Sequence, residues 1–118
     1  MEAKLNIWLN CTSEEPTKTF VCRRLLYGAS EKIENYSNQV NKLEKKRKDE
    51  LKKDNPDIDL IKKLEQEQFE SNISILKTLF PDFQDDDFKG IDIPEYQAFI
   101  TEIRKEMQRI LTQASKNL

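Results

Sequence analysis

The sequence of 118 residues contains no histidine, only two glycines and only two cysteines. Without histidine, the usual general base and the Ser/His and Cys/His nucleophile pairs are missing, which excludes a large share of enzyme chemistry. Cys11 and Cys22 are too few for a zinc site when no histidine can act as a co-ligand. We therefore expect a binding protein with no catalytic residue, no metal and no cofactor. We expect both thiols to be reduced, because no sequence feature directs the chain to an oxidising compartment.

Long apolar runs are also missing. No stretch approaches the roughly 20 consecutive apolar residues of a membrane span, and the N-terminus lacks the apolar run of a signal peptide. The net charge is -2, with 20 basic and 22 acidic side chains mixed along the chain. This balance provides no field to attract nucleic acid or an anionic membrane. We predict a soluble cytosolic protein that binds neither of them.

The composition leaves little material for a core. Hydrophobic residues make up 36% of the chain and charged residues another 36%, whereas globular domains average about 45–50% and about 25%. One thin core in a single domain, residues 1–118, is the most that this composition supports. Such chains often complete their core with a second copy or a partner, so we expect a homo-oligomer.

The N-terminal residues 3–22 predict a β-hairpin. Within residues 4–9, Leu5, Ile7 and Leu9 alternate with polar residues and share one face, and residues 17–22 are β-branched and aromatic. An isolated hairpin is marginal in water, so this one must contact a helix or another molecule's sheet. Trp8 lies on the polar face, which means either that this face is covered as well or that Trp8 lies at an interface.

Residues 23–80 predict an antiparallel helical hairpin. From Arg23 to Leu43, apolar residues recur at steps of three and four, the stripe of an amphipathic helix, in which Gly28 marks a close contact or a break. Beyond Leu43 the stripe fades, so residues 42–58 form a solvated charged arm. The short link at 54–56 makes the two helices antiparallel.

The second helix has clear boundary residues. Asn55 suits its N-cap and Pro56 its first position, and Pro81 stops it by forcing Phe80 out of the helical region. Residues 81–91 then form an acidic, aromatic loop or single turn, closed by Gly90 in a left-handed conformation.

A capping box of Asp92 and Glu95 opens a C-terminal helix at 92–115. Tyr96, Phe99, Ile103 and Met107 belong to its apolar stripe. The stripe stops after Leu111, so residues 114–118 should contribute little to stability.

Two charged clusters have competing interpretations. Residues 85–87 with Gly90 are spaced like a calcium loop, but Lys89 then occupies a ligand position and Tyr96 the place of the bidentate glutamate. We favour carboxylates at the N-terminus of a helical turn. The basic run 42–53 is interrupted by acidic residues and has no aromatic residue for base stacking. A solvated helix is favoured there over a site for nucleic acid or for an acidic protein surface.

Aromatic residues gather around the last two predicted helices. Core packing is the favoured interpretation, but six aromatic residues are generous for so small a core, and the alternative is that some of them line a groove for a partner's helix. They are Phe69, Phe80, Phe83, Phe88, Tyr96 and Phe99. Among them we predict Phe83, Phe88 and Tyr96, together with Trp8, as partner-binding residues.

The order of these elements resembles that of the tail assembly chaperones of long-tailed bacteriophages. A hairpin containing Lys-Thr-Phe at 18–20 leads into helices, then into Phe-Gln-Asp-Asp-Asp-Phe-Lys-Gly-Ile at 83–91 and a final amphipathic helix. The resemblance covers most of the chain in outline and residues 75–105 closely. The charged arm around 42–58 is longer than is usual in that family.

The resemblance implies a non-enzymatic protein made in the host cytoplasm of an infected cell and absent from the mature virion. Its partners would be the phage tape measure protein, which it keeps soluble, the tail tube protein that displaces it, and further copies of itself. The competing hypotheses are a helical adaptor that pairs with a partner's coiled coil and a small nucleic-acid-binding regulator. The predicted fold is mainly α with a small N-terminal β-hairpin, an antiparallel helical hairpin and a C-terminal amphipathic helix.

Overall fold

The computed structural model describes the backbone of residues 1–116 and the side chains of residues 1–113. The end of the predicted C-terminal tail, Asn117 and Leu118, lies outside the described residues. The fold is mainly helical with a two-stranded antiparallel hairpin at the N-terminus, which confirms the predicted class. Its elements are, in order, β1 (Ala3–Ile7), β2 (Lys18–Cys22), α1 (Tyr27–Leu51), α2 (Ile58–Leu79), a short 3-10 helix η1 (Asp85–Gly90) and α3 (Ile93–Lys116).

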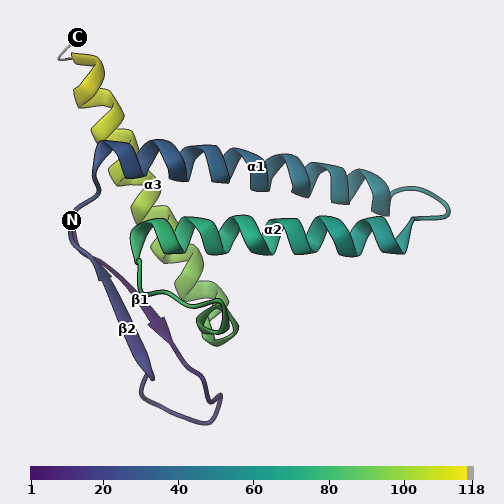
Figure 1. The fold of residues 1–118 in the computed structure, drawn as a ribbon, viewed down its shortest axis with the longest axis horizontal. Coiled ribbons are helices and arrows are strands. Elements are labelled where there is room, and N and C mark those ends of the chain that lie inside the picture. Colours follow the sequence, from purple (N-terminus) through teal and green to yellow (C-terminus); the bar gives the residue numbers. More distant parts are fainter. Residues whose placement is uncertain (117–118) are drawn as a thin grey trace.

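The molecule is a flat assembly of these elements, measuring 50 × 44 × 21 Å. Helices α1 and α2 run antiparallel and side by side, and α3 crosses them near the end that carries the β-hairpin (Figure 1). The other end of the α1–α2 pair projects away from α3 and the sheet. This projection, residues 42–65, contains the predicted charged arm at 42–58 and the start of α2. From here on we call the whole projection the arm, and the remainder of the molecule the body. No helix within residues 1–116 is long and apolar enough to cross a membrane.

The first strand ends earlier than the alternation predicts. Ala3, Leu5 and Ile7 are buried as expected, but Leu9 is 53% exposed. The chain leaves the sheet after Ile7, because the Trp8 N–H donates to the carbonyl oxygen of Gly90 at 2.7 Å instead of continuing the strand. The prediction that Leu9 shares the buried face is therefore wrong.

Gly90 is required for a reason other than the predicted one. No residue in the part of the chain described here has a positive φ, so the predicted left-handed turn at Gly90 is wrong. A Cβ atom at this position would lie 2.7 Å from both Ile7 Cγ2 and the carbonyl oxygen of Trp8. Glycine therefore permits η1 to approach the end of β1 at backbone distance.

The acidic turn η1 is held by its own carboxylate. Asp87 is buried, and its side chain accepts hydrogen bonds from the Gln84 N–H at 2.9 Å and from Lys18 Nζ at 3.1 Å. The bond from Gln84 caps the N-terminus of the turn, the role that the sequence predicted for these carboxylates. The bond from Lys18 joins η1 to β2. Within the described residues, no cluster of three or more His, Cys, Asp or Glu side chains could hold a metal ion.

Helix α1 begins at Tyr27, four residues later than predicted. The chain is still extended at Leu26 (φ -84°, ψ 152°), whose side chain is 63% exposed, while Leu25 is buried. An extended connection is needed to carry the chain from the edge of the sheet to the helix. A Cβ atom at Gly28 would meet no atom within 4 Å, and the helix runs through it, so Gly28 marks neither a close contact nor a break.

The boundaries of α2 were predicted correctly at one end. Phe80 is extended (φ -132°, ψ 94°) immediately before Pro81, as expected. At the other end the N-cap is Asp57, whose carboxylate accepts a hydrogen bond from the Leu60 N–H at 3.2 Å. The predicted cap, Asn55, lies in the turn before the helix. Asp57 takes its place because its carboxylate is an acceptor at the residue that immediately precedes the first helical residue.

Helix α3 starts at the predicted place. The Asp92 carboxylate accepts a hydrogen bond from the Glu95 N–H at 3.3 Å, which is one half of the predicted capping box. The Glu95 carboxylate instead accepts from Asn6 Nδ2 at 3.5 Å and so contacts β1.

The core fills the space between the sheet, α3 and the body end of the α1–α2 pair. It is a single cluster of buried side chains with Phe99, Ile103 and Met107 of α3 as expected. The complete set is Ala3, Leu5, Ile7, Cys22, Leu25, Ile33, Ile75, Leu76, Phe80, Phe83, Phe99, Ile103 and Met107.

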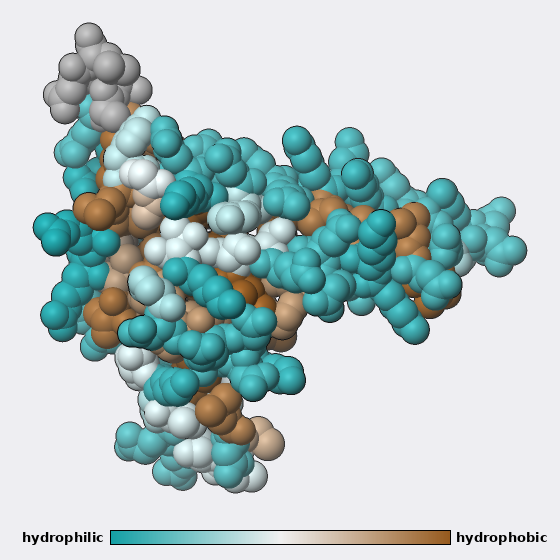
Figure 2. Space-filling model, viewed as in Figure 1, coloured by the Kyte–Doolittle hydropathy of each residue, from teal (hydrophilic) through white to brown (hydrophobic). Residues whose placement is uncertain are grey.

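The arm has a smaller set of apolar contacts of its own. Leu43, Ile61 and Leu64 are buried there and do not belong to the main core cluster. Figure 2 shows the arm as mostly hydrophilic, with hydrophobic patches between hydrophilic side chains. The arm is thus held together by few apolar residues and needs polar contacts as well.

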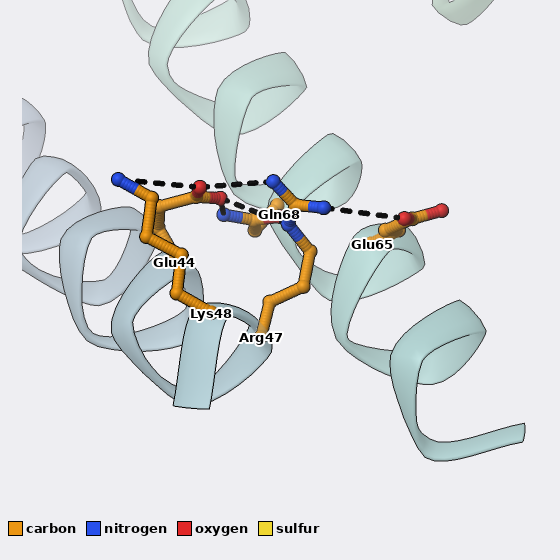
Figure 3. Close-up of polar contacts among 5 residues, drawn as sticks. All are labelled: Glu44, Arg47, Lys48, Glu65 and Gln68. Atoms are coloured by element: carbon orange, nitrogen blue, oxygen red, sulfur yellow. Dashed lines mark hydrogen bonds and ion pairs between the residues drawn. The ribbon is translucent and has the colours of Figure 1, made fainter. Parts of the chain in front are cut away.

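Those polar contacts lie between α1 and α2 (Figure 3). The Glu44 carboxylate accepts hydrogen bonds from Arg47 at 3.0 and 3.1 Å and from Gln68 Nε2 at 2.7 Å, and Arg47 also lies 3.7 Å from Glu65. The predicted solvated arm has an exception here, because Glu44 and Arg47 are only partly exposed and join the two helices.

Glu50 closes the arm at its tip. This residue is buried, and its carboxylate accepts from Lys53 Nζ at 2.7 Å and from the Asp57 N–H at 2.9 Å. Both hydrogen bonds hold the pKa of the Glu50 carboxyl below its ordinary value, and the bond from Lys53 has the larger effect. Glu50 therefore satisfies the backbone of the interhelical turn, in a position that the sequence analysis assigned to solvent.

The two glycines provide a matched test of the η1–β1 approach. Replacing Gly90 with alanine should lower the free energy of unfolding by about 1–3 kcal/mol, because the new methyl group overlaps Ile7 and Trp8. Replacing Gly28 with alanine should raise it by up to about 1 kcal/mol, because the site is open and helical. Urea denaturation measures both. Equal effects of the two substitutions would contradict the close approach.

The polar contacts of the arm predict a dependence of stability on pH. Hydrogen bonds from Arg47 and then Gln68 lower the pKa of Glu44 from 4.5 to about 2. A carboxylate whose pKa is lower in the folded state stabilises the fold above its unfolded pKa and loses this contribution as the pH falls through the folded pKa. The stabilisation is therefore present above pH 4.5 and is lost between 4.5 and about 2.

Melting temperatures measured from neutral pH down to about pH 2 test this linkage. The Glu44→Gln variant should lose less stability across the acidic range than the parent protein does. The control is Glu31→Gln, a change at an exposed carboxylate of α1 outside the arm, which should keep the parent's slope. Parallel curves for the parent and Glu44→Gln would show that the Glu44 contacts contribute nothing.

Candidate protein-binding groove

Phe83 lies in the core. Its side chain is 1% exposed, and its ring lies 5.5 Å from that of Phe20, which in turn lies 5.2 Å from Phe80. A turn after α2, closed by the Phe83 N–H on the carbonyl oxygen of Phe80 at 2.9 Å, directs the residue back under the hairpin. Phe83 is thus not available to a partner, contrary to its predicted place in a groove.

Phe88 contacts the rings of two other aromatic residues. It is half-buried between Phe69 of α2, at 5.0 Å and 85°, and Tyr96 of α3, at 6.0 Å and 72°. Edge-to-face contacts of this kind add to the stabilisation from burial alone. They fix the ring of Tyr96 relative to α2.

Tyr96, one of the predicted partner-binding residues, lines a groove whose other residues were not predicted. The groove has a volume of about 290 Å³ and lies where α1, α2 and α3 meet. Its apolar lining comes from Val40, Ile75 and Ile100, one from each helix. We call it the three-helix groove; its remaining lining residues are Ser37, Asn72, Gln97, Thr101 and Arg104.

Tyr96 and Arg104 give the groove its polar character. The Tyr96 hydroxyl donates a hydrogen bond to Asn72 Oδ1 at 3.0 Å, which joins α3 to α2. Burial raises the pKa of Tyr96 to about 12, and the positive charge of Arg104 acts in the opposite direction. The phenol is therefore neutral at physiological pH, and Arg104 carries the only charge among the residues that line the groove.

Trp8 belongs to a different cleft. It is half-buried and lines an opening of about 480 Å³ between the hairpin loop and the start of α3, together with Cys11, Ser13, Lys89, Gly90, Ile91, Asp92 and Glu95. Cys11 is a free, exposed thiol, and Cys22 is free and buried. Of the four predicted partner-binding residues, the structure brings Phe88 and Tyr96 together and separates Trp8 and Phe83 from them.

Most residues of the groove have no distinctive pattern in the sequence. Val40 and Ile100 fit the apolar stripes and were assigned to the core, although both are only half-buried. A signal was present in α3, where Gln97, Thr101 and Arg104 recur at steps of four and three and therefore share one side of the helix. Polar residues beside an apolar stripe can be recognised as the edge of a groove only when the positions of the neighbouring helices are known.

Comparison with known proteins adds no further constraint. No family model matches the chain, and no curated protein or solved structure matches it. The function must therefore be inferred from the groove, the Trp8 cleft and the exposed side chains themselves.

The placements of Phe83 and Phe88 predict different costs of truncation. Phe83→Ala should lower the free energy of unfolding by about 3–5 kcal/mol, because it empties a fully buried site. Phe88→Ala should cost clearly less, because that side chain is partly solvated. Urea denaturation measures both, with exposed Leu9→Ala as the control. A cost for Phe83→Ala no larger than that of Leu9→Ala would remove Phe83 from the core.

Proposed function

We propose that this chain is a tail assembly chaperone of a long-tailed bacteriophage or prophage. In this role it is a non-enzymatic protein of the host cytoplasm and is absent from the mature virion. It binds the tape measure protein, which is long and helical, and keeps it soluble until the tail tube protein replaces it. No cofactor takes part, and neither nucleic acid nor membrane is a partner.

The observation that carries the proposal is the three-helix groove. Its apolar side chains Val40, Ile75 and Ile100 are bordered by polar ones, which is the arrangement that receives the apolar face of a partner's helix. A chaperone of an apolar helical protein needs such a surface, and needs no catalytic group. The order of elements, with a hairpin, paired helices, an acidic aromatic turn and a final helix, agrees with the resemblance.

Exposed apolar side chains support the further expectation of a homo-oligomer. On the body, Leu26, Tyr27 and Ile93 are 63%, 49% and 69% exposed. Single exposed apolar residues are common on monomers, but this chain also has a thin core and a two-stranded sheet whose β2 lies at an edge. Unpaired strand edges are surfaces on which another chain can add.

A helical adaptor is the second candidate function, and the arm favours it. Leu51, Ile58 and Leu60 are 48%, 56% and 38% exposed at or near the tip. Apolar residues at the end of a projecting helical pair could engage a partner's coiled coil. In that case the arm would carry the interaction and the groove would be incidental.

Co-expression with the tape measure protein tests the proposal. The fraction of tape measure protein in the soluble lysate should rise when this chain is present and should stay unchanged with an unrelated helical protein. A variant with Leu51, Ile58 and Leu60 replaced by serine should retain the effect, because its groove is intact. Loss of the effect in this variant would favour the adaptor, and insolubility of the tape measure protein with the parent chain would refute the chaperone.

A further inference from the structure

Arg104 differs from the cations next to it on α3 in its ion pairing. On α3, Lys105 pairs with Glu102 at 3.5 Å and Arg109 pairs with Glu106. Arg104 has no ion-pair partner among the residues that the structure describes. The chain as a whole has a net charge of -2, so a lone guanidinium at the only cationic position of the groove is a local feature and does not reflect a basic surface.

The size of the groove restricts what it can hold. Pockets that enclose whole small molecules measure about 300–1,000 Å³, and the three-helix groove, at about 290 Å³, lies at the lower limit. Its sides come from three helices, and Gln97, Thr101 and Arg104 at its border are exposed. These dimensions suit one or two side chains of a helix that lies across the border better than a complete ligand.

We propose that the three-helix groove binds a partner's helix through an apolar anchor side chain, which contacts the partly exposed Val40 and Ile100 beside the buried Ile75, and through a carboxylate, which pairs with Arg104. Arginine favours carboxylates because its planar, forked donors match their two oxygens. The identity of the partner as a tape measure protein rests on the proposed function, but the preference for an acidic residue beside an apolar anchor does not.

The expected position of the carboxylate follows from helix geometry. Along α3, Ile100 and Arg104 are four residues apart and therefore lie one turn from each other on the same side. A partner helix that runs along α3 would thus present its apolar anchor and its acidic residue at a similar spacing. A lysine at that place would meet the charge of Arg104 and bind less tightly.

Two synthetic amphipathic peptides provide the probes. They are identical except for one residue a turn after a central leucine, which is glutamate in one and lysine in the other. Fluorescence anisotropy of labelled peptides against the full chain should give a dissociation constant about two- to fivefold lower for the glutamate peptide, the scale expected for an exposed ion pair. Equal affinities, or no binding of either peptide up to millimolar concentration, would overturn the proposal.

Matched variants locate the effect. Arg104→Glu should reverse the preference, so that the lysine peptide binds more tightly, whereas Lys105→Glu, with the same change in charge on the adjacent residue, should leave the preference unchanged. Thr101→Trp, which places a large side chain in the groove, should weaken both peptides at least tenfold. Thr112→Trp, at an exposed position of α3 outside the groove, should not.

The same variants distinguish a failure of the groove assignment from a failure of the chaperone hypothesis. Circular dichroism melting establishes that each variant is folded before it is titrated. A glutamate preference that survives Arg104→Glu, or binding that survives Thr101→Trp, would overturn the groove assignment even if the tape measure protein is solubilised. Peptide binding with the expected pattern, together with an unaffected tape measure protein, would support the groove and remove the proposed function.

Discussion

The contact between the end of β1 and η1 is the constraint on which the rest of the body depends. A two-stranded sheet is marginal on its own in water, and this one is held by the Trp8–Gly90 hydrogen bond and by the pair between Lys18 and Asp87. The same contact places the start of α3 against β1, because α3 begins three residues after Gly90. The direction of α3, and with it one side of the groove, therefore follows from a backbone approach that only glycine permits.

A high charge content is compatible with this fold because charged residues perform several different structural tasks. Asp57 and Asp92 cap helices, Asp87 joins η1 to the sheet, and Glu44 and Glu50 join the two helices of the arm. Each of these carboxylates satisfies donors that would otherwise be unpaired, which matters more than the attraction between exposed charges. A chain with too few apolar residues for a long helical pair is thereby able to form one.

Local sequence information was sufficient for the elements and insufficient for their contacts. The alternation around Leu5 and Ile7, the stop at Pro81 and the cap at Asp92 are decided within a few residues, and each was predicted correctly. The role of Gly90 and the burial of Phe83 depend on β1 and β2, which lie more than 60 residues away along the chain. The groove likewise depends on three helices at once, so Arg104 had no pattern to distinguish it from other exposed cations.

The buried apolar residues of the arm lie outside the main core cluster. Because Leu43, Ile61 and Leu64 are few and do not belong to the body cluster, we expect local opening of the tip to require less free energy than global unfolding. Such local opening exposes the tip of the hairpin while α3 and the sheet stay folded. The arm is thus the part of the molecule in which local opening removes no side chain from the main core cluster.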